Sequence, residues 1–379
     1  MPLPSQRSRF DIPPDVTYLN CAYMGPLSRA ALAAGDAGLR AKQHPWTITA
    51  PDFFRNAATL RGLVAGLMGA APADIAIVPS ASYGIAVAAA NLPLAAGRRV
   101  LLLDEAFPSM VYAWRERAAD AGAEVVTVPR PEDDDWTRAV LALVDERVAV
   151  ACLPHCHWTD GTLLDLEAIG ARLRTVGAAL VVDATQSFGA FPFDVTRIQP
   201  DFMTAAAYKW LLGPYSLGYL YAAPHRQDGR PLEHNWMGRE GAEDFAGLTR
   251  YRDALQPGAR RYDVGESANF ALLPVAIAAL GEIHEWTVEA INETLRGVTT
   301  QIADGAAPLG LRAPAPARRA GHYIGLRASK PLPSDLVARL ASEQVFVSVR
   351  GPAIRVAPHL YNETSDVERL LDVLEAALA

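Results

Sequence analysis

An aspartate and a lysine, each following a short apolar run, are the residues of this chain whose types and positions best suit chemistry. Asp183 follows the run at residues 178–182, and Lys209 follows the run at residues 204–207. A carboxylate can keep a pyridinium nitrogen protonated, and a primary amine can hold an aldehyde as a Schiff base. The pair therefore supplies both groups that pyridoxal phosphate chemistry requires.

The elements around this pair decide whether the two side chains can meet. The run at residues 178–182 is continuous and ends in valines, which is typical of a strand buried on both faces. Asp183 then lies at the carboxyl end of a strand, where open α/β sheets bind ligands. Lys209 stands between small alanines and the apolar residues 210–212, so we expect burial to lower its pKa. Taken singly, Asp183 is equally well explained as a helix cap.

Three segments carry a resemblance to a known family. Residues 183–186, 207–209 and 213–218 resemble the class V aminotransferases, a family of fold-type I pyridoxal phosphate enzymes. That family includes cysteine desulfurases, kynureninases and isopenicillin epimerase-like proteins. The resemblance runs from residues 18–26 to residues 354–362. It implies an α/β fold with a large domain on a mainly parallel seven-stranded sheet, and a small α+β C-terminal domain.

The resemblance assigns the residues that would hold the cofactor, pyridoxal 5'-phosphate. Lys209 is implied as the Schiff-base lysine, Asp183 as the partner of the pyridine nitrogen, and Gln186 as the partner of the ring hydroxyl. Lys209 and Asp183 are therefore the expected catalytic residues. Lys209, once released from the cofactor, is also the natural base for the proton on the substrate Cα.

A phosphate-binding segment is implied near residue 81. Ala81 and Ser82 stand where the family commonly has two threonines. Small residues let backbone N–H groups approach a phosphate, and the run that follows favours a helix whose N-terminus attracts the anion. Tyr208 resembles the tyrosine with which kynureninase-like members reach the phosphate, although an ordinary interior tyrosine is the alternative.

Aromatic residues are implied around the cofactor ring. Phe107 stands where desulfurases stack a histidine on the cofactor, and a phenyl ring can stack but cannot exchange protons. Trp158 takes the place of a desulfurase asparagine. His157 and Trp158 are expected in the wall of the active site.

The C-terminal part supplies the expected substrate contacts. Arg355 resembles the family's arginine for the substrate α-carboxylate, a role that suits the planar guanidinium fork. Arg350 is the alternative for this role, and a surface arginine in a strand is the plainer interpretation. Asn20 and Tyr23 lie in a segment that approaches the active site in relatives.

The cysteines argue against one branch of the family. Desulfurases carry a nucleophilic cysteine on a loop before the arginine, whereas Cys21, Cys152 and Cys156 all lie elsewhere in this chain. We therefore do not expect a persulfide-forming desulfurase. His155 and His157 flank Cys156, but no second Cys/His cluster accompanies them, so we expect no metal site.

One segment is expected to face a second subunit. The stretch at residues 234–269 resembles segments that relatives present to the neighbouring subunit's phosphate, with Trp236 and Ser267 as the residues of interest. This predicts a homodimer with a shared active site, and symmetric dimers are the commonest assembly. A surface loop with buried aromatic residues is the alternative.

Composition is that of an ordinary cytoplasmic enzyme. The chain has 379 residues, 50% of them hydrophobic, and a formal net charge of −7. Such a charge argues against nucleic-acid binding. No apolar run is long enough for a membrane span, no leader segment is evident, and three cysteines fit a reducing compartment.

Alternating helical patterns and short apolar runs predict three parts. Residues 1–50 are an N-terminal arm and helix, residues 51–270 the large cofactor-binding domain, and residues 271–379 the small C-terminal domain. Within the last part we expect a helix at 273–286, strands at 323–326 and 345–348, and a closing helix from residue 365 or 366.

These observations predict an enzyme that acts on the Cα of an L-amino acid, with aminotransferase as the leading reaction. The alternatives are a C–S β-elimination lyase acting on an S-substituted cysteine, a kynureninase-like hydrolase, and a non-catalytic protein that kept the fold. The intact Lys209, Asp183, Gln186 and Arg355 argue against the last.

Overall fold

A seven-stranded sheet forms the centre of the protein, as seen in a computed structural model that describes residues 2–378. From one edge to the other its strands are β2 (Ile75–Val78), β8 (Gly218–Ala222), β7 (Phe202–Ala206), β6 (Ala179–Asp183), β5 (Val148–Pro154), β3 (Arg99–Leu103) and β4 (Glu124–Val128). Only β8 runs against its neighbours. The predicted mainly parallel α/β sheet is confirmed.

The inner strands are apolar along their whole length because helices cover both faces. Every residue of β5, β6, β7 and β8 is buried, as expected for a sheet enclosed on two sides. One face packs against α3 (Ala81–Asn91) and α4 (Pro108–Ala121). The other packs against α2 (Asp52–Gly66), α5 (Trp136–Leu141), α6 (Leu166–Thr175), α7 (Val195–Ile198) and α8 (Leu272–Trp286). No helix within residues 2–378 is long and apolar enough to cross a membrane.

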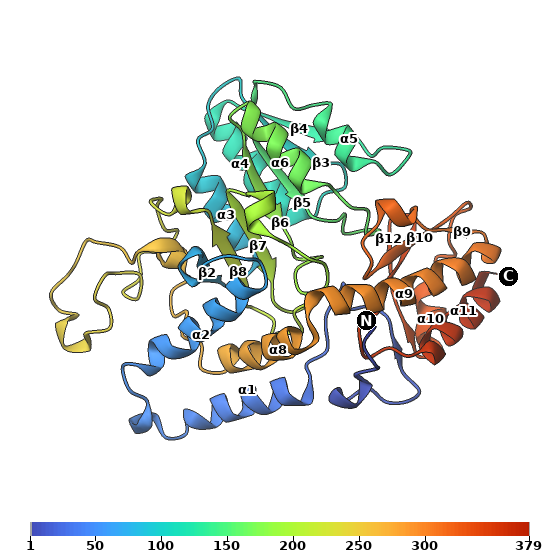
Figure 1. Cartoon of the computed structure of the whole chain (residues 1–379), viewed down its shortest axis with the longest axis horizontal. Helices are drawn as coiled ribbons and strands as arrows, with labels where there is room; N and C mark the ends of the chain where they lie inside the picture. Colours follow the sequence, from blue (N-terminus) through green and yellow to red (C-terminus); the bar gives the residue numbers. More distant parts are fainter. Residues whose placement is uncertain (1, 379) are drawn as a thin grey trace.

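A smaller α+β unit follows in the chain and lies to the right in Figure 1. Its antiparallel sheet has the order β12 (Ser348–Arg350), β13 (Ala353–Val356), β10 (Ile324–Ala328) and β9 (Leu311–Arg312). The helices α9 (Val288–Ala306), α10 (Leu336–Ser342) and α11 (Thr364–Leu378) accompany it. These helices and strands share one apolar core, which includes Ile302, Leu326, Leu340, Ile354 and Leu370.

The strand predicted at residues 345–348 is in fact two strands. Its first part is β11 (Val345–Phe346), which pairs in parallel with β1 (Thr17–Tyr18) from the N-terminal arm. Its last residue, Ser348, begins β12 and pairs with β13. The chain changes partners here because each half finds a different neighbour, one of which is more than 300 residues away in sequence.

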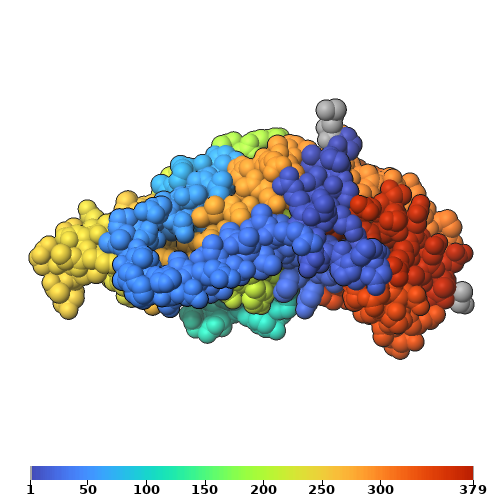
Figure 2. Space-filling view, turned by 90° about the horizontal axis from the view of Figure 1, so that it is seen from below, coloured from blue at the N-terminus to red at the C-terminus, as the bar shows by residue number. Residues whose placement is uncertain are grey.

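The N-terminal segment therefore joins both units. Its first residues lie against the C-terminal unit, and α1 (Arg29–Ala41) runs along the lower face of the molecule (Figure 2). There α1 packs on α8, which lies after residue 270 yet contributes Leu273 and Leu280 to the core beneath the large sheet. The boundaries at residues 50 and 270 stay predictions.

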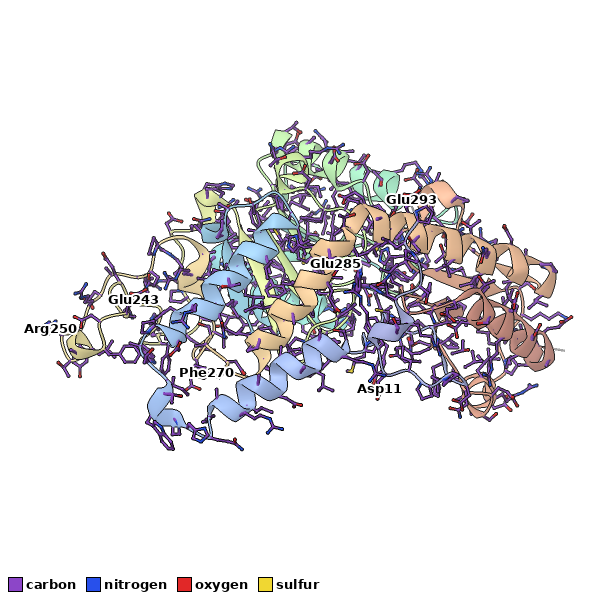
Figure 3. The ribbon with its side chains drawn as sticks, turned by 60° about the horizontal axis from the view of Figure 1, so that its bottom comes forward. Asp11, Glu243, Arg250, Phe270, Glu285 and Glu293 are labelled. Carbon is purple, nitrogen blue, oxygen red and sulfur yellow. The ribbon has the colours of Figure 1, made fainter. Side chains whose placement is uncertain are left out.

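A long irregular segment between β8 and α8 extends away from the body of the protein. Figure 3 shows Glu243 and Arg250 near its far end, beyond α2. The segment contains only short 3-10 turns, at Phe245–Gly247 and Gly258–Tyr262 among others. Two aromatic rings of the segment, Trp236 and Phe245, pack edge-on against Phe53 of α2.

The start of α3 depends on a glycine. A Cβ at Gly84 would lie 2.7 Å from the Cβ of Thr204 in β7 and would collide with its hydroxyl. We predict that Gly84→Ala forces α3 away from the sheet and lowers the free energy of unfolding by about 1–3 kcal/mol. Urea denaturation measures this loss. Gly62→Ala in α2, where no atom lies within 4 Å, should instead stabilise by about 0.5–1 kcal/mol; equal effects of the two substitutions would contradict the prediction.

Candidate active site

A cavity of about 290 Å³ opens at the carboxyl ends of β5, β6 and β7. Eight residues predicted from the sequence line it: Ala81, Ser82, Phe107, Trp158, Asp183, Gln186, Tyr208 and Lys209. They come from segments far apart in the chain that meet because parallel strands place their carboxyl ends at one edge of the sheet. The arrangement is that of a ligand site in an open α/β sheet.

The aspartate and the lysine face this cavity from neighbouring strand ends. Asp183 ends β6 and accepts a hydrogen bond from the backbone N–H of Thr185, at 2.9 Å. Burial raises the pKa of Asp183, and the Thr185 hydrogen bonds oppose that rise. Lys209 follows β7, and burial, reinforced by the nearby Arg355, lowers its pKa to about 8. Its amine therefore titrates close to neutral pH.

The N-terminus of α3 forms one wall and can receive an anion. Ser80 is the N-cap, and its hydroxyl accepts from the Tyr83 N–H at 3.2 Å and lies 2.8 Å from the Ser82 hydroxyl. The first amides of a helix lack internal partners, so they are free to donate to a phosphate. Tyr208 and Tyr215 also line the cavity, and their ring centroids lie 4.6 Å apart.

Two aromatic rings cover the cavity above the lysine. Phe107 and Trp158 meet edge to face, with ring centroids 5.5 Å apart. The Lys209 Nζ lies 5.7 Å from the centroid of Phe107. The Trp158 indole N–H donates to the carbonyl of Glu105 at 2.7 Å, which fixes the orientation of the ring. A flat ligand between these rings and the sheet would be stacked and shielded from water.

The amide of Gln186 already has protein partners at both ends. Its Nε2 donates to the carbonyl of Ala22 at 3.1 Å, and its Oε1 accepts from the Trp210 indole at 3.0 Å. These bonds tie the N-terminal segment to the floor of the cavity. The expected contact of Gln186 with a ring hydroxyl stays a prediction.

Three of the predicted substrate contacts lie at the border of the cavity without lining it. Arg355, buried in β13, donates to the carbonyl of Trp158 at 3.0 Å and to the hydroxyl of Ser348 at 3.5 Å. The same hydroxyl donates to the Asn20 side chain at 2.7 Å. Tyr23, on the same segment, is exposed. Burial, reinforced by Arg350, lowers the pKa of Arg355 to about 10.

The structure places three other predicted residues away from the cavity. His157 is fully buried and stacks on the ring of Trp136, with centroids 5.2 Å apart, so it lies behind the wall that Trp158 forms. Trp236 packs against Phe53 of α2 and Phe245 of the extended segment, and Ser267 is buried outside the cavity lining. Within one chain, these side chains do not reach the Asp183–Lys209 pair.

Ten further residues line the cavity that the sequence did not single out for it: Pro79, Ser80, Ser109, Met110, Pro154, Cys156, Thr185, Ala206, Tyr215 and Ser216. Several of them are next to a predicted residue in the sequence, and this closeness could have been used to predict them. Among these ten residues, Cys156 is the one with a thiol side chain. Its thiol donates to the carbonyl of Gln186, and burial raises its pKa to about 12, so it is a protonated thiol and not a nucleophile.

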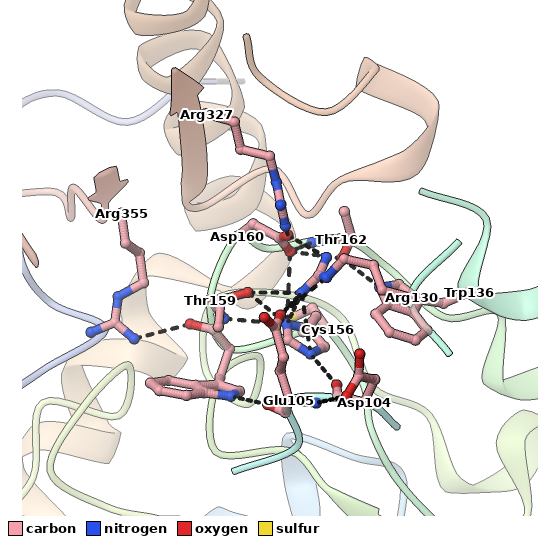
Figure 4. Close-up of polar contacts among 12 residues, drawn as sticks. Asp104, Glu105, Arg130, Trp136, Cys156, Thr159, Asp160, Thr162, Arg327 and Arg355 are labelled. Atoms are coloured by element: carbon pink, nitrogen blue, oxygen red, sulfur yellow. Dashed lines mark hydrogen bonds and ion pairs between the residues drawn. The ribbon is translucent and has the colours of Figure 1, made fainter. Parts of the chain in front are cut away.

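A buried ionic network holds the wall segment at residues 155–163 (Figure 4). Asp160 accepts from Arg130 at 2.8 Å and from Arg327 at 2.5 Å, and its other oxygen accepts from the Thr162 hydroxyl at 2.7 Å. Arg130 follows β4 of the large sheet, whereas Arg327 belongs to β10 of the small one. Asp160 therefore links the two units, two residues after Trp158 in the chain.

No group of three or more His, Cys, Asp or Glu side chains suited to a metal ion occurs within residues 2–378. The ring of His155 packs edge-on against Phe191 and Phe193, and burial lowers its pKa to about 4. The ring of His157 contacts Trp136 instead. The two histidines thus have separate surroundings, apolar for His155 and partly polar for His157, whose ring nitrogens also lie near Thr159 and the carbonyl of Asp104.

Comparison with known proteins extends this picture. The family described as Aminotransferase class-V matches residues 48–370. The uncharacterized aminotransferase YcbU of Bacillus subtilis is 29% identical over 83% of this chain and 82% of its own length. Kynureninase of Deinococcus radiodurans is 28% identical over 100% of this chain and 93% of its own length. Isopenicillin N epimerase of Streptomyces clavuligerus is 24% identical over 98% of this chain and 97% of its own length.

Solved structures share the fold. A complex of the cystine C–S lyase C-DES with cysteine persulfide superposes with a TM-score of 0.87, at 20% identity and over 96% of this chain and 98% of that one. Apo cysteine desulfurase from Thermococcus onnurineus NA1 gives a TM-score of 0.84 at 18% identity, covering 99% of both chains. Similar folds therefore accompany several different reactions.

The Asp160 network makes a prediction about stability. Burial alone would raise the pKa of Asp160, but His157, Arg130 and Arg327 lower it to about 2, below its ordinary 3.8. Asp160→Asn removes a buried carboxylate from two guanidinium groups, of which Arg130 keeps its ion pair with Glu105, so we expect a loss of about 3–5 kcal/mol in the free energy of unfolding. Urea denaturation at pH 7 measures this loss.

The pH dependence of the free energy of unfolding distinguishes the contribution of the Asp160 charge from that of its packing. Because the pKa of Asp160 is lower in the folded state, its stabilisation is complete above about pH 4 and disappears as the pH falls towards 2. The wild type should therefore lose more stability than Asp160→Asn over that interval. Asp133→Asn, which breaks an exposed pair with Arg138, should change stability little at any pH. Parallel pH profiles for wild type and Asp160→Asn would contradict the assignment.

Proposed function

Because the chain belongs to the class-V aminotransferase family, whose members are pyridoxal phosphate enzymes, we propose that it acts on the Cα of an L-amino acid as an aminotransferase. The observation that carries this proposal is the buried amine of Lys209, which shares one cavity with the buried carboxylate of Asp183. YcbU, named an aminotransferase, supports the choice of reaction.

The residues of the cavity fit pyridoxal phosphate. Lys209 offers the amine for its aldehyde and Asp183 the carboxylate for its ring nitrogen, while the amides at Ala81 and Ser82 offer donors for its phosphate. Phe107 offers a ring to stack on it. When bound, the cofactor supplies an electron sink for negative charge that develops at the substrate Cα.

Burial affects Asp183 and Lys209 in opposite senses, and both effects suit the proposed roles. Burial raises the pKa of Asp183, and a positively charged ring nitrogen beside it would favour the carboxylate form again. Burial lowers the pKa of Lys209 to about 8, so a useful fraction of the amine is neutral near pH 7. A base with a pKa near the working pH is also the most effective carrier of a proton.

Arg355 is the proposed partner of the substrate α-carboxylate. Its guanidinium is buried, its Nε has no hydrogen-bond partner among the described residues, and no carboxylate is paired with it there. A buried cation without a counter-ion is unfavourable, so an incoming carboxylate is stabilised in return. Asn20 supports this arginine through Ser348, and Trp158 holds it through its carbonyl.

A second candidate reaction is C–S β-elimination, and a third is kynureninase-like hydrolysis. Phe107 and Tyr208 in the cavity and the similarity to a kynureninase favour the hydrolase as much as they favour the aminotransferase. Persulfide chemistry is disfavoured, because burial raises the pKa of the cavity thiol Cys156 and keeps it protonated.

We also propose a homodimer in the cytoplasm, with an active site completed by the extended segment of a second copy. That segment exposes apolar side chains that a monomer leaves in water: Trp236, Phe245, Leu248 and Tyr251, the last at 96%. A surface of this kind rimmed by charged residues is typical of an interface between subunits. Trp236 and Ser267 stay the residues proposed to approach the partner's cofactor.

Replacement of the lysine tests the proposed function directly. Lys209→Ala should lower turnover by roughly 10²–10⁴-fold or more, because both the anchor for the cofactor and the base for the Cα proton are removed. Borohydride treatment of the wild type, followed by mass spectrometry, should find the cofactor attached at Lys209. Lys330→Ala, at an exposed position, is the matched control and should keep full activity. Full activity of Lys209→Ala would overturn the proposal.

A single turnover with L-amino acids, in the absence of any keto-acid acceptor, decides between the reactions. An aminotransferase should accumulate the amino form of the cofactor and one keto acid. Release of pyruvate and ammonia from an S-substituted cysteine, with the cofactor unchanged, would identify a lyase instead. Release of alanine from kynurenine would identify the hydrolase.

Light scattering coupled to size exclusion tests the assembly. We expect the mass of two chains for the wild type, and a shift towards one chain when Phe245 and Tyr251 are both replaced by Ser. Tyr112→Ser removes a ring of similar exposure from α4 and should leave the mass unchanged. A wild-type protein with the mass of one chain would refute the dimer.

A further inference from the structure

Two arginines outside the cavity lining add positive charge to the active site. Lys209, Arg350 and Arg355 lie close enough that both arginines lower the pKa of the lysine, in addition to the larger effect of burial. Asp183 is the acid of the cavity lining. If Lys209 is neutral and Asp183 serves the cofactor nitrogen, two guanidinium charges remain for the substrate.

Neither arginine has a carboxylate partner within the described chain. Arg355 donates to a carbonyl and a hydroxyl, and Arg350 donates to the carbonyl of Val349 at 2.8 Å. The buried Arg61, by contrast, has Asp263, although the buried Arg319 also donates to a carbonyl. The buried Nε of Arg355 has no partner at all among these residues. The site thus holds two positive charges that a ligand can neutralise.

The two guanidinium groups stand side by side because of the strand register. In the β12–β13 hairpin Arg355 pairs with Ser348, and Arg350 pairs with Ala353. Residues 348 and 350 share one face of their strand, and cross-strand partners share that same face. Arg350 and Arg355 are therefore diagonal neighbours on one face, where side-chain origins lie roughly 7–8 Å apart.

The ring of Trp158 shows that this face points at the cavity. The guanidinium carbon of Arg350 lies 5.8 Å from the Trp158 ring centroid, and that of Arg355 lies 6.0 Å from it. Trp158 itself lines the cavity. Both cations thus flank one aromatic residue of the cavity wall.

From this arrangement we infer that the substrate is an amino acid with a second carboxylate on its side chain, and that Arg350 binds this carboxylate while Arg355 binds the α-carboxylate. The inference rests on the proposed function and narrows it to acidic amino acids. A substrate with one carboxylate leaves Arg350 without a counter-ion, whereas a dicarboxylate pairs with the guanidinium groups of both arginines. Arg350 is then a specificity-determining residue.

Calorimetric titration of the holoenzyme with glutarate and with its monoamide, glutaramate, tests the inference without turnover. The two probes differ in one charge. The wild type should bind glutarate roughly tenfold more tightly or better, as a charged hydrogen-bonded contact implies. Arg350→Gln should remove this difference and leave glutaramate binding unchanged. Arg355→Gln should weaken both probes, and Arg138→Gln, an exposed substitution of the same charge, should weaken neither.

Kinetics give a second measurement on the same variants. The ratio of kcat/KM for L-glutamate to that for L-glutamine should fall by roughly tenfold or more in Arg350→Gln. Equal affinity of the wild type for the two probes, or an equal loss for both in Arg350→Gln, would overturn the inference. Failure of the proposed function is distinguishable, because it would show as full activity of Lys209→Ala whatever the probes do.

Discussion

Burial of a lysine amine is the constraint on which the rest of this site depends. An ammonium group loses its hydration in the interior, and the consequence here is a Lys209 pKa of about 8. The neighbouring residues maintain that burial, because Trp210, Leu211 and Leu212 continue directly into the apolar core. A single short segment thus couples the stability of the fold to a chemically available amine.

The two ends of the cavity are built by different parts of the protein. The large sheet and α3 provide the groups proposed for the cofactor, whereas the β12–β13 hairpin provides the two arginines proposed for the substrate. Asp160 connects these parts through Arg130 and Arg327, and Gln186 connects the N-terminal segment to them. Because the substrate end is a separate element, related folds can keep one cofactor site and differ in the reaction that they catalyse.

Much of the large domain was predictable because its signals are local. Continuous apolar runs identified β5, β6 and β7, since strands covered on both faces carry no polar alternation. The same logic placed Asp183 and Lys209, two of the residues that line the cavity, at strand ends. The resemblance to a family with this fold supplied the remaining roles, which local patterns alone do not contain.

The sequence by itself determined where the inner strands of the large sheet lie, which residues carry reactive groups, and the class of fold. Only the tertiary structure decided which distant segments meet: β1 with β11, Asp160 with Arg130 and Arg327, and Gln186 with Ala22. It also turned His157 towards Trp136, away from the cavity, and set Arg350 beside Arg355. The physical reason is that apolar patterning reports burial of a residue but not its partner, whereas ion pairs and stacked rings depend on the elements that packing brings together.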